Sequence, residues 1–212
     1  ADLNCSTIDI GDNGYLDTNN NTVTANSTVT VNGVYNATGD TVDSQHGQIQ
    51  TNSGGIYAAT SGITTLTGVD PDFIDNDGTF VHNDGTIVLD GVESFRGDNA
   101  LTLYNVVVLD SASLERTDIS AGTTVINEFN ITDNAVRIYR GIITLGNASQ
   151  SATVNVSGTS RGFTTLAYPH HFYIYAASED HPVQVYGNTW TTNGRSDESV
   201  YAHFKWINFT DD

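Results

Sequence analysis

Apolar residues alternate with Thr, Asn or Ser in many short runs along this chain of 212 residues. Clear examples are Thr28-Val29-Thr30-Val31, Thr86-Ile87-Val88-Leu89 and Ala152-Thr153-Val154-Asn155-Val156. A period of two predicts β-strands that bury one face. No stretch of a dozen residues has the 3.6-residue period of an amphipathic helix, so we expect an all-β protein with almost no helix.

Turn-forming residues follow nearly every one of these runs. The pairs Asn32-Gly33, Asp84-Gly85 and Asp90-Gly91 are typical, because Gly, Asn and Asp adopt the backbone conformations that tight turns require. All-β chains of this length close as sandwiches, barrels or solenoids. The strands are short and two-residue hairpin loops are rare, which favours a parallel β-helix or β-solenoid; a β-sandwich or jelly roll is the alternative.

Three phrases carry a resemblance to a known class of proteins: residues 79–91 (TFVHNDGTIVLDG), 101–108 (LTLYNVVV) and 141–147 (GIITLGN). The stretch from Thr79 to Gly158 resembles the degenerate β-solenoid repeats of secreted surface and adhesin-type proteins, and residues 8–66 echo it more weakly. The resemblance implies stacked parallel coils and an extracellular structural or adhesive role. It brings no catalytic residues to this chain.

The composition changes near residue 162, where aromatic and histidine side chains become frequent. Both Trp, four of the six His and the only Lys lie in the last 51 residues. We therefore divide the chain into a solenoid-like repeat region over residues 1–161 and an aromatic-rich β region over residues 162–212. The second region is expected to cap the solenoid, because an open coil end exposes unpaired strand edges.

The polar surface is built from hydroxyl and amide side chains rather than from charges. Asn, Ser, Thr and Gly supply 86 of the 212 residues, whereas charged residues supply 15%. The net charge is nevertheless −18, from 25 acidic and 7 basic residues. Such a chain lacks the positive surface that phosphate backbones require, which excludes nucleic acid as a partner. No apolar run approaches the roughly 20 residues of a membrane-spanning helix.

Cys5 is the only cysteine, so the chain forms no internal disulfide. A leftover cysteine in a secreted chain predicts an intermolecular disulfide between subunits; a buried or idle thiol is the alternative. The chain begins at Ala1 and contains no Met, and we interpret it as a mature, processed chain or as a fragment. Together with the resemblance, this predicts an extracellular location at a cell or virion surface.

The pattern Asn-x-Ser/Thr, the acceptor for N-linked glycan in secreted proteins, recurs along the chain. Chain composition alone accounts for part of this number, because Asn, Ser and Thr are all abundant. The hypothesis is a glycan-coated surface, and the alternative is a set of turns rich in Thr and Asn. The eight candidate sites are Asn4, Asn20, Asn26, Asn36, Asn130, Asn147, Asn155 and Asn208.

The acidic run over residues 70–78 is the one candidate metal site. Asp72, Asp75 and Asp77 precede Gly78, and Ca²⁺ takes six to eight oxygen ligands of this type. The spacing departs from the EF-hand pattern, because Phe73 stands at the first ligand position and Asp84 at the last. A solvated loop without an ion is the alternative, and we expect no other cofactor.

Aromatic side chains of the C-terminal region are candidates for contact with a glycan or a protein partner. Tyr186, Trp190 and Trp206 are the strongest of these, since Trp and Tyr stack on sugar rings and are enriched in interfaces. Filling of a capped core is the alternative role for the same residues.

No catalytic arrangement stands out, and we expect that the protein is not an enzyme. The chain has no Gly-x-Ser-x-Gly motif and no cysteine away from its terminus. The leading hypothesis is an extracellular structural protein that assembles with copies of itself into a filament, sheath, fibre or virion appendage. An adhesin or glycan-binding module is the second hypothesis, and a polysaccharide-active β-helix enzyme is the third.

Overall fold

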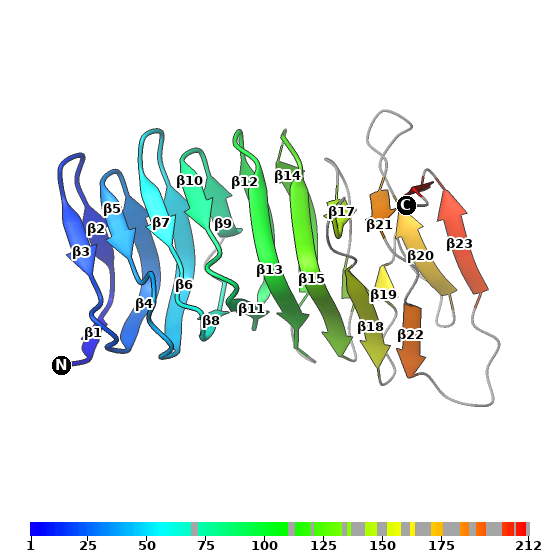
Figure 1. Ribbon diagram of the computed structural model, residues 1–212, viewed down its shortest axis with the longest axis horizontal. Helices are drawn as coiled ribbons and strands as arrows, with labels where there is room; N and C mark the ends of the chain where they lie inside the picture. Colours follow the sequence, from blue (N-terminus) through cyan, green and yellow to red (C-terminus); the bar gives the residue numbers. More distant parts are fainter. Residues whose placement is uncertain are drawn as a thin grey trace.

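The computed structural model describes residues 1–68, 72–109, 113–119, 121–132, 135–136, 143–147, 152–157, 162–163, 171–175, 183–186, 190–193, 201–205 and 207–210. These residues form 24 strands and no helix, and the strand pairings among them are parallel. The strands follow one another along a single axis, from the N-terminal end at the left of Figure 1 to the C-terminal end at the right. The chain is an all-β parallel β-solenoid, which confirms the predicted fold class and rules out the sandwich.

The strands stack into three parallel rows, because each coil of the chain places strands above those of the coil before it. Row A contains β1 (Leu3–Cys5), the first part of β4 (Val23–Val31), the first part of β6 (Ser44–Thr51), β8 (Ile63–Leu66), β11 (Thr86–Leu89), the second part of β13 (Leu101–Val108), the second part of β15 (Thr123–Thr132), β18 (Thr153–Ser157) and β22 (Trp190–Asn193). Row B contains β2 (Ile8–Ile10), the second parts of β4 and β6, β9 (Asp72–Asn76), β12 (Val92–Gly97), β14 (Ser113–Ile119), β16 (Ala135–Val136) and β19 (Gly162–Phe163).

Row C is built in two parts. It begins with a separate four-stranded sheet of β3 (Tyr15–Asp17), β5 (Val34–Asn36), β7 (Ile56–Ala58) and β10 (Thr79–Val81). It continues in the 18-stranded sheet with the first parts of β13 and β15, then β17 (Ile143–Leu145), β21 (Val183–Tyr186) and β24 (Ile207–Thr210). Two further strands, β20 (His171–Tyr175) and β23 (Tyr201–Lys205), pair with each other.

The boundary predicted at residue 162 falls inside these rows. The strands β19, β21 and β22 come after it in the chain, yet they pair with β16, β17 and β18, which come before it. The solenoid pairing therefore continues into the C-terminal region.

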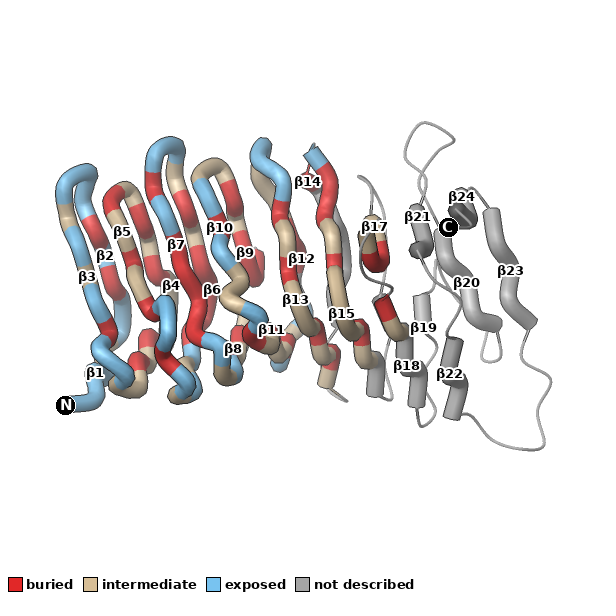
Figure 2. The backbone as a smooth tube through the Cα atoms, viewed as in Figure 1, coloured by how far each residue is buried: buried red, intermediate tan, exposed pale blue. Residues whose placement is uncertain are grey.

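The alternating residues of each strand fill the interior, as the period of two predicted. In β4, Val23, Ala25, Val29 and Val31 are all buried, and the Thr residues between them are partly exposed. The same alternation runs along β13. Figure 2 shows the buried positions alternating with partly exposed ones along the described strands.

An aromatic stack fills the interior behind the first four strands of row C. The rings of Tyr35 and Tyr57 lie 4.5 Å apart and nearly parallel, and Phe80 continues the stack 5.4 Å from Tyr57. His46 of row A meets the edges of Tyr35 and Tyr57, and its Nε2 lies 3.0 Å from the Tyr57 hydroxyl. Stacked rings fit here because the spacing between paired strands is about 4.8 Å, which is close to the separation of ring centroids in offset-stacked aromatic pairs.

Tight turns between rows B and C explain part of the glycine content. A Cβ at Gly78 would lie 2.5 Å from the carbonyl oxygens of both Asn52 and Gly55, which belong to the turn beneath it. The stacked turns thus pass too close for any side chain. Between rows C and A, most of the left-handed turn positions are filled by Asn and Asp: Asn19, Asn20, Asn83 and Asp84 have positive φ, as does Gly39.

The coil length varies, which hides the repeat in the sequence. Thr86 pairs with Asn105, 19 residues later, whereas Ile49 pairs with Ile74, 25 residues later. The extra residues lie in turns and strand bulges, where the chain can lengthen without changing the stacked strands.

Candidate functional site

The coil at the N-terminal end of the solenoid presents three strands that pair on one side. We call β1, β2 and β3 the end coil. They pair with β4, β4 and β5 respectively, and none of them pairs with any other strand in the described part of the chain. Figure 1 shows this coil as the outermost layer of the solenoid.

The hydrogen bonds of the end coil identify which backbone groups face outward. Leu3 N donates to Thr22 O at 3.0 Å, Asn32 N donates to Ile10 O at 2.8 Å, and Thr18 N donates to Asn36 O at 3.0 Å. In a parallel ladder, alternate residues direct their N–H and C=O groups to the same side. The backbone groups of Asn4, Asp9, Tyr15 and Asp17 therefore face away from the second coil, toward the open edge.

The interior-facing residues of the end coil are apolar. Ile8 and Ile10 are buried, while Cys5 and Leu16 are partly buried and pack against the core. Leu3 is 38% exposed, because it has a neighbouring coil on one side alone. The end coil thus combines strands that pair on one side with apolar inward-facing side chains, a combination on which a further layer of strands can stack.

Side-chain contacts hold the end coil against the second coil. The N-terminal ammonium donates to Asn21 Oδ1 at 2.8 Å, and Asp2 Oδ1 accepts from Thr22 N at 3.1 Å. On the outer face of row C, the amide of Asn36 donates to the Tyr15 hydroxyl at 3.0 Å. The edge is therefore preorganised rather than frayed, which lowers the entropy lost when another strand pairs with it.

Cys5 belongs to this end coil. Its thiol donates to Thr24 O at 3.7 Å and is half-buried, with the side chain packed against the core. The predicted intermolecular disulfide thus concerns a residue of β1, the row A strand of the end coil.

The end coil is acidic. Asp2, Asp9, Asp12 and Asp17 are all exposed, and the first 95 residues contain 13 Asp and Glu but no Lys or Arg. All seven basic residues lie between Arg96 and Lys205. Sequence reasoning about total charge missed this asymmetry, although the positions of the basic residues show it directly.

The proposed calcium ligands do not share one outward-facing loop. Asp72 is buried, with 1% of its surface exposed, and its Oδ2 lies 3.4 Å from Arg96 Nη1. Burial raises the pKa of the Asp75 carboxyl, the carboxylates of Asp77 and Asp98 add to this rise, and Arg96 opposes it. Asp77 Oδ1 accepts the amide of Asp98 at 2.8 Å. No group of three His, Cys, Asp or Glu in the described residues is placed to hold a metal ion.

The described sequons differ in how their asparagines are used. Asn4 and Asn26 are exposed. Asn20 is exposed too, but its Oδ1 accepts from Thr41 N at 3.0 Å, and Asn36 is tied to Tyr15. Asn130 and Asn147 are partly exposed. Asn155 and Asn208 stand in β18 and β24, and their side chains lie outside the described part.

The aromatic candidates fall in the C-terminal strands. Tyr186 is the last residue of β21 and Trp190 the first of β22, and their side chains are outside what the structure describes. Trp206 lies outside the described residues altogether. Their predicted contact with a glycan or partner stays a prediction.

Sequence reasoning missed a buried polar cluster around Tyr57. His46 and Tyr57 are fully buried, and Thr64 and Ser44 lie within hydrogen-bonding reach of each other at 3.1 Å beside them. Burial lowers the pKa of His46 to about 4 and raises the pKa values of Tyr35 and Tyr57 well above the ordinary value of a tyrosine. The cluster therefore holds neutral groups at physiological pH, and His46 and Tyr57 lie in the interior.

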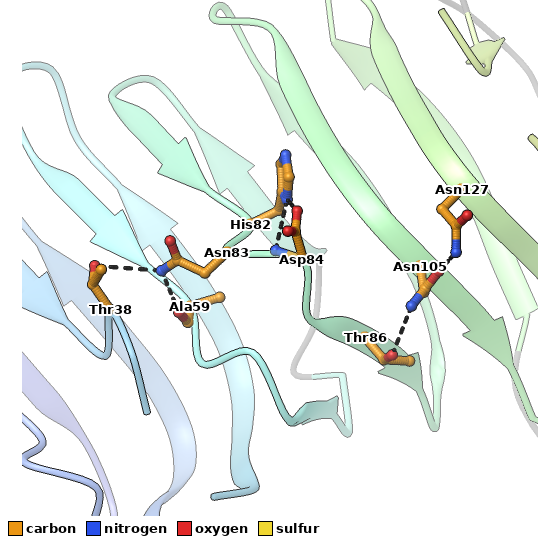
Figure 3. A network of polar contacts seen from close by, with 8 residues as sticks. All are labelled: Thr38, Ala59, His82, Asn83, Asp84, Thr86, Asn105 and Asn127. Atoms are coloured by element: carbon orange, nitrogen blue, oxygen red, sulfur yellow. Dashed lines mark hydrogen bonds and ion pairs between the residues drawn. The ribbon is translucent and has the colours of Figure 1, made fainter. Parts of the chain in front are cut away.

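Sequence reasoning also missed a line of polar contacts along the surface, drawn in Figure 3. Asn127 donates to Asn105 Oδ1 at 2.8 Å, and Asn105 donates to Thr86 at 3.2 Å. Asn83 donates to Ala59 O at 2.6 Å, and the ring of His82 stacks on Tyr104 at 5.6 Å. These contacts join successive coils, which is the role that ladders of Asn play in stacked strands.

Comparison with known proteins returns no significant match: no protein-family model, no curated sequence and no solved structure is significantly similar to this chain. Within the described residues, no helix is long and apolar enough to cross a membrane.

Proposed function

We propose that this protein is a non-enzymatic extracellular structural protein whose copies assemble through the ends of their solenoids. The observation that carries the proposal is the parallel stacking of the coils, in which the three strands of the end coil each pair on one side among the described residues and lie over an apolar layer. Strand addition to such an edge gains main-chain hydrogen bonds and buries apolar surface together. The products are a filament, sheath, fibre or virion appendage.

The surface chemistry supports an extracellular structural role. Hydroxyl and amide side chains dominate the exposed positions, and the acidic residues keep free copies apart by repulsion. Two of the described titratable residues have structural roles: His46 is fully buried, and Asp72 pairs with Arg96.

The edge can be blocked by a single substitution. Asp9→Pro removes an outward-facing N–H that no other described strand uses, and proline is tolerated on strand edges. Asp9→Asn is the matched control, because it removes the same negative charge and keeps the N–H.

Sedimentation velocity and negative-stain electron microscopy across a concentration series test the proposal. We expect wild type and Asp9→Asn to form end-to-end assemblies as concentration rises, and Asp9→Pro to form far fewer. Particles of wild type that stay monomeric at every concentration would overturn the proposal, and so would equal assembly by Asp9→Pro and Asp9→Asn.

A further inference from the structure

Negative charge is concentrated in one part of the solenoid. We call residues 1–95 the acidic segment: it contains 13 Asp and Glu and no Lys or Arg, whereas residues 96–212 contain 12 acidic and 7 basic residues. Of the net charge of −18, the acidic segment therefore carries −13 and the rest of the chain −5. Self-repulsion among charges of one sign destabilises a compact state.

The fold packs these charges along a short axis. The acidic segment supplies five strands to row A, namely β1, β4, β6, β8 and β11. Five layers at about 4.8 Å each span about 24 Å, which gives about one carboxylate per 2 Å of axis. Double-stranded DNA carries one charge per about 1.7 Å of axis and gathers a condensed layer of counterions. The folded acidic segment thus approaches the charge density of a polyelectrolyte, whereas the unfolded chain, at up to about 3.4 Å per residue, spreads the same charges over a far longer path.

On row B, several of these charges stand close together. Asp75 is partly exposed and pairs in register with Arg96 of the next coil. Burial raises the pKa of the Asp75 carboxyl and the carboxylates of Asp77 and Asp98 raise it further, whereas Arg96 lowers it. Arg96 also lies 3.4 Å from Asp72 Oδ2, so its positive charge is shared between two carboxylates. The single base of this cluster therefore does not balance the acids around it.

We propose that the acidic segment takes up inorganic cations from the medium as it folds, so that the protein is stable in salt-rich surroundings and unstable in dilute buffer. The cations form a diffuse layer around the coils instead of filling a coordination site. Added salt shortens the range of the repulsion, from about 30 Å at 0.01 M to about 3 Å at 1 M. The inference concerns the folding of a single copy and does not depend on the proposed self-assembly.

Urea unfolding in a series of NaCl concentrations tests this inference, because urea is uncharged and adds no screening of its own. We expect the urea midpoint of wild type to rise with the logarithm of the salt concentration, by about 1 M in total between about 0.02 and 0.5 M NaCl. KCl should act as NaCl does. Dilute protein keeps the copies apart during the measurement.

Hydrogen exchange at each salt concentration shows where the stability is gained. The strands β4 and β6 belong to the acidic segment, and β13 and β15 lie outside it. Protection should therefore rise more with salt in β4 and β6 than in β13 and β15, because the repulsion that salt screens is stronger where no basic residue offsets the acids.

Two isosteric substitutions on neighbouring coils change the charge in opposite directions. Gln50 and Asp75 pair in register and are both partly exposed. Gln50→Glu places a second carboxylate opposite Asp75, so it should lower the urea midpoint in dilute salt and steepen the rise of the midpoint with salt. Asp75→Asn should do the reverse. The double variant Gln50→Glu/Asp75→Asn is the matched control: it moves one charge by one strand and keeps the net charge, so its salt dependence should stay close to that of wild type.

A urea midpoint of wild type that does not change with salt would overturn the inference. Equal gains of protection in the acidic segment and in β13 and β15 would overturn it too, since the salt effect would then not follow the charge. A rise that saturates at millimolar Ca²⁺ and is absent with Na⁺ would show a specific metal site instead of a diffuse layer. Loss of the whole salt dependence in Asp75→Asn, or a double variant that departs from wild type as far as either single variant, would place the effect at one residue and overturn the inference as well.

Discussion

The early and late parts of the solenoid build the same parallel coil in two different ways. We call β1 to β10 the first region and β11 to β18 the second. In the first region, the long strands β4 and β6 run from row A into row B, and row C is a short separate strand. In the second region, the long strands β13 and β15 run from row C into row A. A long strand therefore bends between rows A and B in the first region and between rows C and A in the second.

The side chains that are buried in row C also differ between the two regions. In three of the four row C strands of the first region, β5, β7 and β10, the middle residue is buried and aromatic: Tyr35, Tyr57 and Phe80. In β13 the buried residues of row C are Leu101 and Leu103, and the middle residue Thr102 is partly exposed. The buried side chains of row C thus change from aromatic to aliphatic, and the ladder of row C is interrupted between β10 and β13.

The two regions are joined by side chains where the ladder of row C is interrupted. His82 follows β10 and its ring stacks on Tyr104 of β13 at 5.6 Å. In row A, which stays continuous, β11 pairs with both β8 and β13. The comparison teaches that a solenoid can change its packing in one row while another row keeps the coils in register.

Removing a ring from the aromatic stack should have the largest effect and should be confined to the first region. Tyr57→Ala empties the centre of the stack between Tyr35 and Phe80, and truncation of a buried aromatic residue costs about 3–5 kcal/mol. Denaturant unfolding measures the total loss, and hydrogen exchange shows where it falls. We expect lost protection in β3 to β10 and retained protection in β13 and β15.

Two variants sharpen this result. Tyr57→Phe keeps the ring and removes the hydroxyl beside His46, so it should lose less stability than Tyr57→Ala. Leu103→Ala in β13 is the counterpart in the second region. Uniform loss of protection from Tyr57→Ala along both regions would show that the solenoid unfolds as one unit, and the comparison would fail.

Low pH should also affect the stability of the two regions differently, because the described buried histidine, His46, lies in the first region. The folded state keeps His46 neutral down to a pKa of about 4, whereas an unfolded histidine takes up its proton near its ordinary value of about 6.5. The unfolded state therefore binds more protons between these values, and stability falls as pH drops from about 6.5 to about 4. The difference of about 2.5 units corresponds to about 3 kcal/mol.

His46→Gln removes this titration and keeps a polar partner for Tyr57. Its melting temperature should depend less on pH between 7 and 4 than that of wild type, with the carboxylates contributing equally to both. The raised pKa of Asp75 acts in the opposite direction, since its protonation favours the folded state. Equal pH dependence of the two proteins would show that His46 does not titrate in this range.

The sequence was sufficient to predict the fold class but not the arrangement of the rows. The alternation in residues 28–31 and 86–89 reports one buried face, and this is a local property of each strand. The coil from Ile49 to Ile74 is six residues longer than the coil from Thr86 to Asn105, so no fixed period is visible. The interruption of the row C ladder between β10 and β13 is likewise invisible before the strands are stacked.

The candidate site was less predictable than the fold. Cys5 was identified as a contact residue from its isolation in the sequence, but its place in the end coil follows from the pairing of β1 with β4. The proposed calcium ligands failed to form one loop because Asp72 begins a strand and pairs with Arg96, which is 24 residues away. Long-range partners of this kind leave no local pattern.

The smallest expected effect concerns the surface ladder of the second region. Asn105→Ala removes the link between Thr86 and Asn127, and loss of such partly exposed hydrogen bonds should cost about 1 kcal/mol. The first region has a counterpart in Asn52, which donates to Asn32 at 2.8 Å. Asn52→Ala breaks one such contact where Asn105→Ala breaks two, so it should cost less. Chemical denaturation of the purified variants measures both.

Asn13→Ala, at an exposed turn of the end coil, is the control and should stay within about 0.5 kcal/mol of wild type. Equal losses from all three variants would mean that the ladders add nothing beyond the general effect of replacing a surface asparagine, and that the backbone pairing alone keeps both regions in register.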